Sequence, residues 1–179
     1  MPTTPHTTIA SGPLRGVPHY TVTPVFLMTS AKKHAIIFDL DGTLCDVRHR
    51  RHFVTEKPKN WKAWNEEMVN DTLNEPVALV YHLLKQLTFY DVILVSGRSE
   101  DYREKTEKWL KDHAIAYDSL YMRAHKDNRD DSIVKSEIAD EIEKTHNIFC
   151  VFDDRKRVVD MWTNRGVWVF DVGQGKGDF

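Results

Sequence analysis

The sequence predicts an α/β protein built on a doubly wound, Rossmann-like parallel sheet, and two observations lead to this fold class. Short apolar runs of strand length recur along the chain, and segments with the apolar spacing of amphipathic helices lie between them. Strands and helices that alternate through short connections favour right-handed βαβ units, which place helices on both faces of a parallel sheet. At 179 residues the chain is long enough for one such domain with one core.

The expected strands are runs of consecutive apolar residues, the pattern of a strand that is covered on both faces. They lie at residues 35–38, 92–95, 148–152 and 167–170. A helix is expected after Asn74, with that residue as its N-cap and Pro76 in its first turn. It should pack on the sheet through an i, i+3, i+4, i+7 stripe formed by Val80, Leu83, Leu84 and Leu87. Similar stripes predict helices within residues 102–110, 134–142 and 158–162.

Composition argues against a membrane protein and against a disulfide-stabilised protein, and it limits how the chain could bind nucleic acid. With 41% hydrophobic and 29% charged residues and no apolar run of membrane-spanning length, the chain is not a membrane protein. The formal net charge of -2 means that any binding of nucleic acid must depend on local basic clusters. The two cysteines, Cys45 and Cys150, are too few for a disulfide framework, which predicts a reducing, cytoplasmic location.

Residues 1–31 are expected to form a disordered leader before a domain at 32–179. The leader is rich in Thr, Pro and Ser and contains no Asp or Glu. Its apolar stretch at residues 25–28 is too short for a secretory signal. An organellar transit peptide and an artefact of the start site, with Met28 as the true start, stay open as alternatives.

Polar residues that follow the predicted strands are the candidate site, because ligands of such sheets bind beyond the carboxyl ends of the strands. Asp39 and Asp41 can project from one face of a strand end, and Gly42 allows a sharp turn there. Two carboxylates with a divalent cation between them suit phosphoryl transfer, since one attacks phosphorus and the other moves the proton of the leaving group. An aspartate-rich strand end alone is also a common turn. The prediction therefore depends on the whole cluster.

The rest of the cluster supplies ligands for a phosphate and for Mg²⁺. A hydroxyl, backbone amides and a guanidinium in Ser96, Gly97 and Arg98 can bind phosphate oxygens. Lys135 can supply a cation to the transferring phosphoryl group, although a lone lysine is usually a solvated surface residue. Asp153 and Asp154 would complete an oxygen-rich site for Mg²⁺.

In order and context, these residues resemble the four-motif signature of haloacid dehalogenase superfamily phosphatases. The matching motifs are Asp39-x-Asp41-Gly42-Thr43, Ser96, Lys135 and Asp153-Asp154. The resemblance implies Mg²⁺ held by Asp39, the backbone carbonyl of Asp41 and Asp154, with Asp153 in support, and it places Thr43 among the phosphate-binding residues. Members that dehalogenate lack the second aspartate, so Asp41 favours phosphate transfer.

A closer resemblance, over about residues 34–179, is to the 3′-phosphatase domain of bacteriophage polynucleotide kinase/phosphatase. It is carried by 95–98, Arg123, 129–131, 153–155, 158–162 and the ending Gly177-Asp178-Phe179. It implies 3′-phosphorylated nucleic-acid ends as substrate, contacted by Ser96, Arg98, Arg123 and Arg155. No obligate protein partner is evident from the sequence, and the expected location is the host cytoplasm if the chain is phage-encoded. No G-x-x-x-x-G-K-[S/T] motif occurs, so no kinase activity is expected of this chain.

Residues 44–74 are expected to form a small flap, or minimal cap, that leaves the site open to a polymer end. Its basic run at 48–52 could contact backbone phosphates, and Trp61 or Trp64 could stack on a base. The more ordinary interpretation is a solvated charged face and two tryptophans that anchor the flap on the core.

Two other functions stay open. The first is a phosphatase of free nucleotides or other small phosphate esters, because the motifs define the reaction and not the leaving group. The second is a non-catalytic domain that binds nucleic-acid ends. The acid pair argues against that second function, because pure binding needs neither Asp39 nor Asp41.

Overall fold

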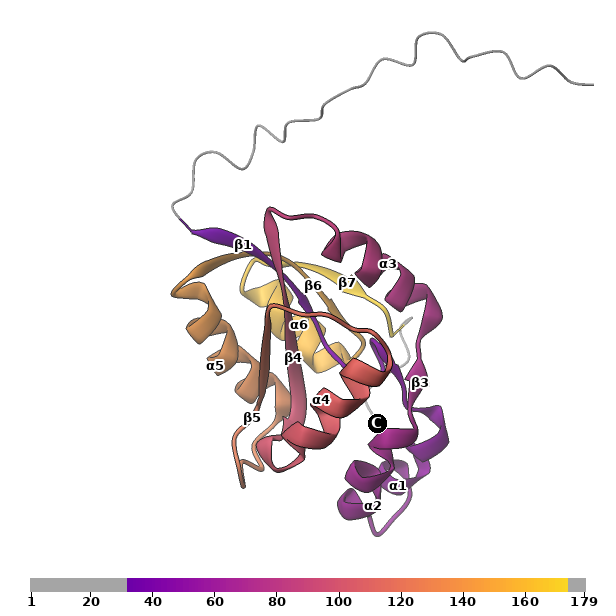
Figure 1. Cartoon of the computed structure of the whole chain (residues 1–179). Coiled ribbons are helices and arrows are strands. Elements are labelled where there is room, and N and C mark those ends of the chain that lie inside the picture. Colours follow the sequence, from indigo (N-terminus) through magenta and orange to yellow (C-terminus); the bar gives the residue numbers. More distant parts are fainter. Residues whose placement is uncertain (1–31, 174–179) are drawn as a thin grey trace, which may run out of the picture. The chain divides into compact units, whose positions relative to one another are not determined.

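Figure 1 shows the computed structural model, which describes residues 32–173. A five-stranded sheet has the order β5-β4-β1-β6-β7, and each neighbouring pair is parallel. The strands are β1 (Lys33–Phe38), β4 (Tyr90–Ser99), β5 (Ser119–Arg123), β6 (His146–Asp153) and β7 (Trp168–Asp171). The predicted α/β fold class and its parallel sheet are confirmed.

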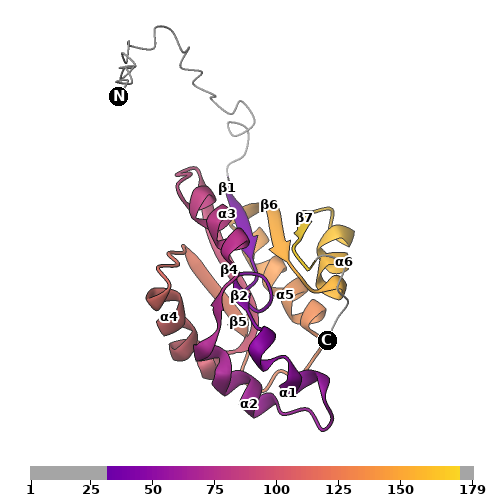
Figure 2. The ribbon, with the colours of Figure 1, turned by 90° about the vertical axis from the view of Figure 1, so that its right-hand side faces the viewer.

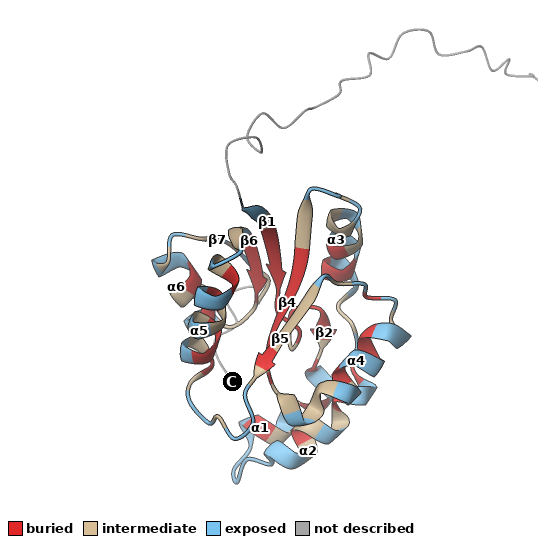
Figure 3. Ribbon diagram, turned by 60° about the vertical axis from the view of Figure 1, so that its left-hand side comes forward, coloured by how far each residue is buried: buried red, intermediate tan, exposed pale blue. Residues whose placement is uncertain are grey.

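Helices cover both faces of the sheet, as Figure 3 shows with the buried strands between two exposed outer layers. They are α3 (Glu75–Lys85), α4 (Arg103–Asp112), α5 (Asp131–Glu143) and α6 (Lys156–Asn164). Alternate residues of β1 face opposite layers. Ile36 and Phe38 pack in the cluster that includes residues of α3 and α4, whereas Ala35 and Ile37 pack in the cluster that includes residues of α5 and α6. This burial on both faces explains why β1 appears in the sequence as a continuous apolar run.

Strand β5 was not expected from the sequence. Among residues 32–173 its one partner strand is β4, and it forms one edge of the sheet. Met122 is buried, but the other residues of the strand are half-buried. An edge strand of this kind needs no continuous apolar run, so the sequence contains no pattern that marks it.

The predicted packing face of α3 is right at Leu84, which packs against the core, and wrong at Val80 and Leu83. Val80 and Leu83, from the predicted stripe, are 39% and 61% exposed, whereas Val77 and Tyr81 are buried. The ring of Tyr81 meets Phe38 edge to face, and its hydroxyl donates a hydrogen bond of 2.8 Å to the carbonyl of Ala116. Apolar residues occur around most of this helix, so spacing alone did not identify the face that packs on the sheet.

The flap, residues 44–74, lies beyond the carboxyl ends of the strands (Figure 2). It contains β2 (Cys45–Asp46), η2 (Arg48–Arg50), α1 (His52–Thr55), α2 (Trp61–Glu66), η3 (Glu67–Asn70) and β3 (Thr72–Leu73). Strands β2 and β3 are antiparallel partners, with Cys45 opposite Leu73. Asn74 occupies the N-cap position of α3, but its side-chain amide donates to the carbonyl of Thr43 at 3.0 Å instead of capping the helix. The flap therefore leaves the sheet layer and returns to it at one place.

Some predicted features lie outside the described residues: the leader at 1–31 and the ending Gly177-Asp178-Phe179. Within residues 32–173, no helix has both the length and the apolar character needed to cross a membrane. Cys45 and Cys150 are both buried and unpaired.

The revised face of α3 can be tested by truncating one residue on each side of the helix. Tyr81→Ala should lower the free energy of unfolding by about 3–5 kcal/mol, because it leaves a cavity against Phe38 and an unpaired carbonyl at Ala116. Leu83→Ala should change it by less than about 1 kcal/mol, because that side chain is mostly in solvent. Urea denaturation of both variants measures the difference, and a larger loss in Leu83→Ala would restore the original stripe.

Candidate active site

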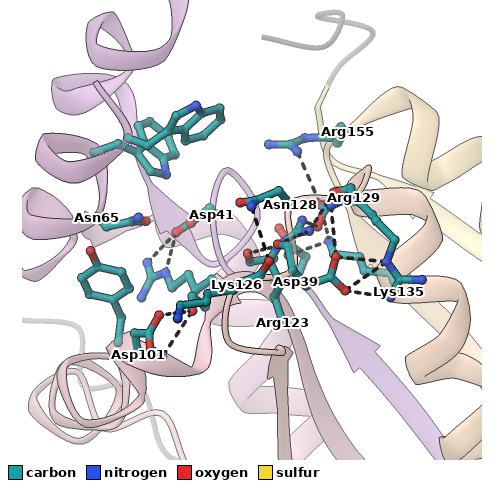
Figure 4. A pocket seen from close by; sticks show the side chains of 18 residues that line it. Asp39, Asp41, Asn65, Asp101, Arg123, Lys126, Asn128, Arg129, Lys135 and Arg155 are labelled. Carbon is teal, nitrogen blue, oxygen red and sulfur yellow. Dashed lines mark hydrogen bonds and ion pairs between the residues drawn. The ribbon is translucent and has the colours of Figure 1, made fainter. Parts of the chain in front are cut away.

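A cavity of about 530 Å³ lies at the carboxyl ends of β1, β4 and β5, beneath the flap (Figure 4). It brings together seven of the residues that the sequence predicted for the site. They are Asp39, Asp41, Gly97, Arg98, Arg123, Lys135 and Arg155. These residues come from distant parts of the chain, and the convergence of strand ends that the fold class implies is observed.

The remaining predicted residues lie around this cavity. Thr43, Ser96 and Asp153 are buried. The Ser96 hydroxyl accepts a hydrogen bond of 3.3 Å from the backbone amide of Arg98, two residues further along β4. Asp154 lines a neighbouring hollow of about 270 Å³, and the hydroxyl of Thr43 donates to one of its carboxylate oxygens at 3.3 Å. A direct contact of Ser96 or Thr43 with phosphate stays a prediction.

Asp39, Asp153 and Asp154 form a compact acidic cluster whose carboxylate oxygens lie within 4.8 Å of one another. Lys135 Nζ donates to Asp39 Oδ1 at 2.7 Å and to Asp153 Oδ2 at 2.8 Å. The other oxygen of Asp153 accepts from the backbone amide of Arg155 at 3.1 Å. Both oxygens of Asp153 are thus engaged, whereas Asp39 and Asp154 each keep one oxygen without a hydrogen bond from residues 32–173.

Burial and mutual repulsion oppose ionisation in this cluster. Burial raises the pKa of Asp39 well above its ordinary value; Lys135 offsets part of that effect, and the neighbouring Asp153 and Asp154 add to it. Burial, and then the charge of Asp153, raises the pKa of Asp154 to about 6. A divalent cation with oxygen ligands would relieve this crowding of negative charge. The residues present therefore fit such an ion.

Two glycines allow the backbone to approach carboxylates closely. Gly42 has a φ of +96°, and a Cβ atom there would lie 2.1 Å from Asp154 Oδ2. A Cβ atom on Gly97 would lie 2.4 Å from Asp131 Oδ1. Any side chain at either position would displace an acidic group of the site.

Asp41 is held by two arginines. Arg50 Nη2 and Arg98 Nε donate to Asp41 Oδ1 at 2.7 Å and 2.9 Å. The same arginines bind Asp71, with Arg50 Nε 2.6 Å from Oδ1 and Arg98 Nη2 3.0 Å from Oδ2. We call Asp41, Arg50, Asp71 and Arg98 the arginine–aspartate cluster. The second oxygen of Asp41 accepts no hydrogen bond from the described part of the chain, so it stays available to a ligand of the cavity.

The arginine–aspartate cluster holds two cations and two anions. Burial alone would raise the pKa of Asp41, but the charges of Arg50 and Arg98 outweigh that effect and hold the pKa well below its usual range. Asp41, Cys45 and Asp71 are close enough together to hold a metal ion. The two arginines already neutralise those carboxylates, so this group is a weaker candidate for a metal than the acidic cluster around Asp39.

Asp71 was not expected at the site, and Arg50 was expected in solvent. Arg50 belongs to the basic run that was expected to be solvated, yet its side chain is fully buried. Its guanidinium carbon lies 3.9 Å from the centre of the Trp64 ring, and Trp64 is 5% exposed. Trp64 is therefore an anchor of the flap, as expected, whereas Trp61 is 53% exposed and lines the cavity. No local pattern in the sequence distinguishes the buried Asp71 from aspartates that lie on the surface.

Arg123 organises the loop after β5. Its Nε donates to the carbonyl of Gly97 at 2.9 Å, its Nη1 to the carbonyl of Arg129 at 2.8 Å, and its Nη2 to Asp131 Oδ1 at 2.9 Å. Asp131, which was noted in the sequence only as part of a charged run, also lies 3.4 Å from Arg155 Nη1. Arg123 thus supports one wall of the cavity, and its contact with substrate stays a prediction.

The parallel sheet, with acidic residues after β1 and β6 and a buried lysine from α5, is the architecture of a haloacid dehalogenase superfamily phosphatase. The fold is similar to that of the class C acid phosphatase from Bacillus anthracis, with 19% identity and a TM-score of 0.55 over 86% of this chain and 72% of that one. Residues 33–179 match the model of the polynucleotide kinase PNKP phosphatase domain, and the chain belongs to this family.

Two relatives are larger proteins. A chain in a structure of the Pnkp1/Rnl/Hen1 complex is 38% identical, with a TM-score of 0.70 over 84% of this chain and 48% of that one. A protein of Autographa californica nuclear polyhedrosis virus, described by its name as a bifunctional polynucleotide kinase/RNA ligase, is 26% identical over 141 residues. This chain spans about half of the first relative and 19% of the second.

The stabilising role of the arginine–aspartate cluster can be tested with two charge-neutralising changes. Asp71→Asn should lower the free energy of unfolding by about 3–5 kcal/mol, because it leaves two buried guanidinium groups with one carboxylate between them. Asp46→Asn is the matched control, since Asp46 pairs with a largely exposed Arg48 and should lose less than about 1 kcal/mol. Urea denaturation reports both values. Similar small losses would mean that the buried pairs do not hold the flap.

Proposed function

We propose that this domain is a Mg²⁺-dependent phosphatase that removes 3′-phosphates from polynucleotide ends through an aspartyl-phosphate intermediate. The observation that carries the proposal is the state of the two candidate catalytic carboxylates. Asp39 and Asp41 both line the cavity, and each has one oxygen fixed by cationic side chains and one oxygen without a hydrogen bond from residues 32–173.

Asp39 is the proposed nucleophile. Lys135 holds Oδ1, so Oδ2 can attack phosphorus in line while the bond from phosphorus to the 3′ oxygen breaks. Burial lowers the pKa of Lys135, but the adjacent carboxylates of Asp153 and Asp39 outweigh burial and raise it above its usual value, so the ammonium stays charged. Lys135 and Arg155 then stabilise the negative charge on the transferring phosphoryl group.

Asp41 is the proposed acid and base. Its free oxygen would protonate the departing 3′ oxygen and later accept a proton from the water that hydrolyses the aspartyl-phosphate. Arg50 and Arg98 favour the ionised form, which is the form needed for that second half of the reaction. A phosphate dianion in the cavity would raise the pKa of Asp41, which favours the protonated form needed for the first half.

Mg²⁺ suits the acidic cluster by charge as well as by ligand type. Asp39, Asp154 and the backbone carbonyl of Asp41 would hold it, with Asp153 in support. The nucleophile Asp39 and three neighbouring carboxylates face three cationic side chains: Asp39, Asp131, Asp153 and Asp154 against Arg123, Lys135 and Arg155. When bound, the ion would reverse the sign of this balance and orient phosphate oxygens.

The substrate proposal is supported by the family and by the open cavity. The matching family is a phosphatase domain of polynucleotide kinase, and one similar structure is described as an RNA repair complex. A cytoplasmic location is part of the same proposal and agrees with the two unpaired cysteines. A phosphatase of free nucleotides remains the alternative, and the substrate panel below separates the two.

Replacing the nucleophile should abolish turnover without unfolding the protein. Asp39→Asn should reduce phosphate release from a 3′-phosphorylated oligonucleotide by a thousandfold or more, on the order seen when other nucleophiles are removed. Asp112→Asn, at a half-exposed carboxylate paired with Lys108, is the control and should keep normal activity. The same wild-type assay compares 3′-phosphorylated and 5′-phosphorylated oligonucleotides with a nucleoside monophosphate. Preference for the 5′ end, or activity confined to the monophosphate, would refute the proposed substrate.

Metal should stabilise the domain more at neutral than at acidic pH. The pKa of Asp154 rises from 3.8 to about 6 on folding, so between these values the folded state binds more protons than the unfolded state. Without metal, stability should therefore fall as pH rises through this window, by at most about 3 kcal/mol for this one group. Mg²⁺ should offset that loss and raise the melting temperature by more at pH 7.5 than at pH 4.5.

Scanning calorimetry in EDTA and in Mg²⁺ measures this effect. Asp154→Asn should reduce the difference between the two pH values, because it removes the titrating group. An Mg²⁺ effect of equal size at both pH values would show that the acidic cluster is not the binding site.

A further inference from the structure

We infer that Trp61, with Asn65 and Tyr102, forms a binding site for the nucleobase of the nucleotide that carries the scissile phosphate. This inference rests on the proposed function and deepens it, because it names what the cavity recognises beyond the phosphate group. It assigns a role in substrate selection to the flap.

The cavity is much larger than its phosphate chemistry needs. Its volume of about 530 Å³ lies within the range of about 300–1,000 Å³ that encloses a whole small molecule. In Figure 4, Lys135 and Arg155 lie on one side of Asp39 and Asp41, whereas Asn65 and Asp101 lie on the other. A phosphate placed at Asp39 therefore leaves the flap side of the cavity for the rest of the nucleotide.

Trp61 is exposed, although its helix α2 is held in place by a cap and by a buried neighbour. Asn60 caps α2 by accepting a hydrogen bond of 3.0 Å from the backbone amide of Ala63, and Trp64 packs against buried Arg50. Trp64 is 5% exposed, whereas Trp61 is 53% exposed and lines the cavity. A half-exposed indole on a helix that is held in place can stack on any of the nucleobases, because every base has a π face.

Polar groups beside this indole match the edge of a base. Asn65 follows Trp61 by one helical turn and lines the same cavity. Its side-chain amide makes no hydrogen bond to the described residues, and it offers both donors and an acceptor. Tyr102 adds a second aromatic ring to the cavity wall.

Positive charge also lies near this side of the cavity. Lys59 Nζ is 5.3 Å from the centre of the Trp61 ring, and Lys126 lines the cavity. Either ammonium group can attract the next phosphate of a polynucleotide. This arrangement favours a nucleotide over an apolar peptide as the ligand of Trp61.

The test compares two 3′-phosphorylated oligonucleotides that differ only in their last nucleotide, which carries adenine in one and no base in the other. Trp61→Leu keeps an apolar side chain but removes the π face, whereas Trp61→Phe keeps an aromatic ring. We expect Trp61→Leu to lower kcat/KM for the adenine-ended oligonucleotide by about tenfold or more and Trp61→Phe to lower it much less. The loss for the abasic oligonucleotide should be at least fivefold smaller. Val69→Ala, at an exposed flap residue away from the cavity wall, is the matched control and should behave as wild type.

Equal losses for the two oligonucleotides, or equal losses in the Leu and Phe variants, would overturn the inference and leave Trp61 a purely structural residue. Unchanged kinetics in Trp61→Leu would overturn it as well. Wild-type inactivity on both oligonucleotides would instead defeat the proposed function. The same variants would then be assayed on a nucleoside 3′-monophosphate and on ribose 3-phosphate, where a base-dependent loss supports stacking and a base-independent loss refutes it.

Discussion

Two buried arginines shared between Asp41 and Asp71 connect the parts of this site. Arg50 comes from the flap and Arg98 from β4, and both bind Asp41 after β1 and Asp71 beside β3. Burying one charge of this set alone would cost several kcal/mol, but two cations against two anions compensate one another. The same contacts that hold the flap on the sheet therefore also orient Asp41, the proposed acid and base, so the cavity and the groups that line it are built together.

The charges around Asp39, unlike those of the arginine–aspartate cluster, do not balance. Lys135 contacts Asp39 and Asp153 and lies 3.7 Å from Asp131, yet negative charge remains in excess there. The charges of the arginine–aspartate cluster compensate one another, whereas the excess of carboxylates around Asp39 can be relieved by protonation or by a cation. The strand end at Asp39 and Asp41 lies between these two environments, which explains how neighbouring carboxylates can have pKa values shifted in opposite directions.

Local patterns predicted the features that depend on local sequence. The apolar runs at 35–38 and 92–95 marked β1 and β4, and the polar residues after them marked the carboxyl end of the sheet where the site lies. Arg50 could not be recognised, because within a basic run its burial depends on an acid 21 residues away. Trp61 and Trp64 likewise share one helix, and only the folded flap separates an anchor from an exposed ring. Edge strand β5 and the packing face of α3 depended on neighbours in the same way.

The flap leaves the sheet layer and rejoins it at a single neck, so its exposed connections can change without moving Arg50 and Asp71, which hold Asp41 in place. Cys45 pairs with Leu73, so the segment begins and ends at adjacent points. The entropy of closing such a segment grows only slowly with its length, so residues can be gained or lost in its exposed connection at 56–59 at little thermodynamic cost, whereas the buried Arg50, Trp64 and Asp71 must stay. Evolution or design can therefore lengthen or shorten this connection while the acidic residues at the strand ends keep their places. Such changes would alter the size of the substrate that the cavity admits.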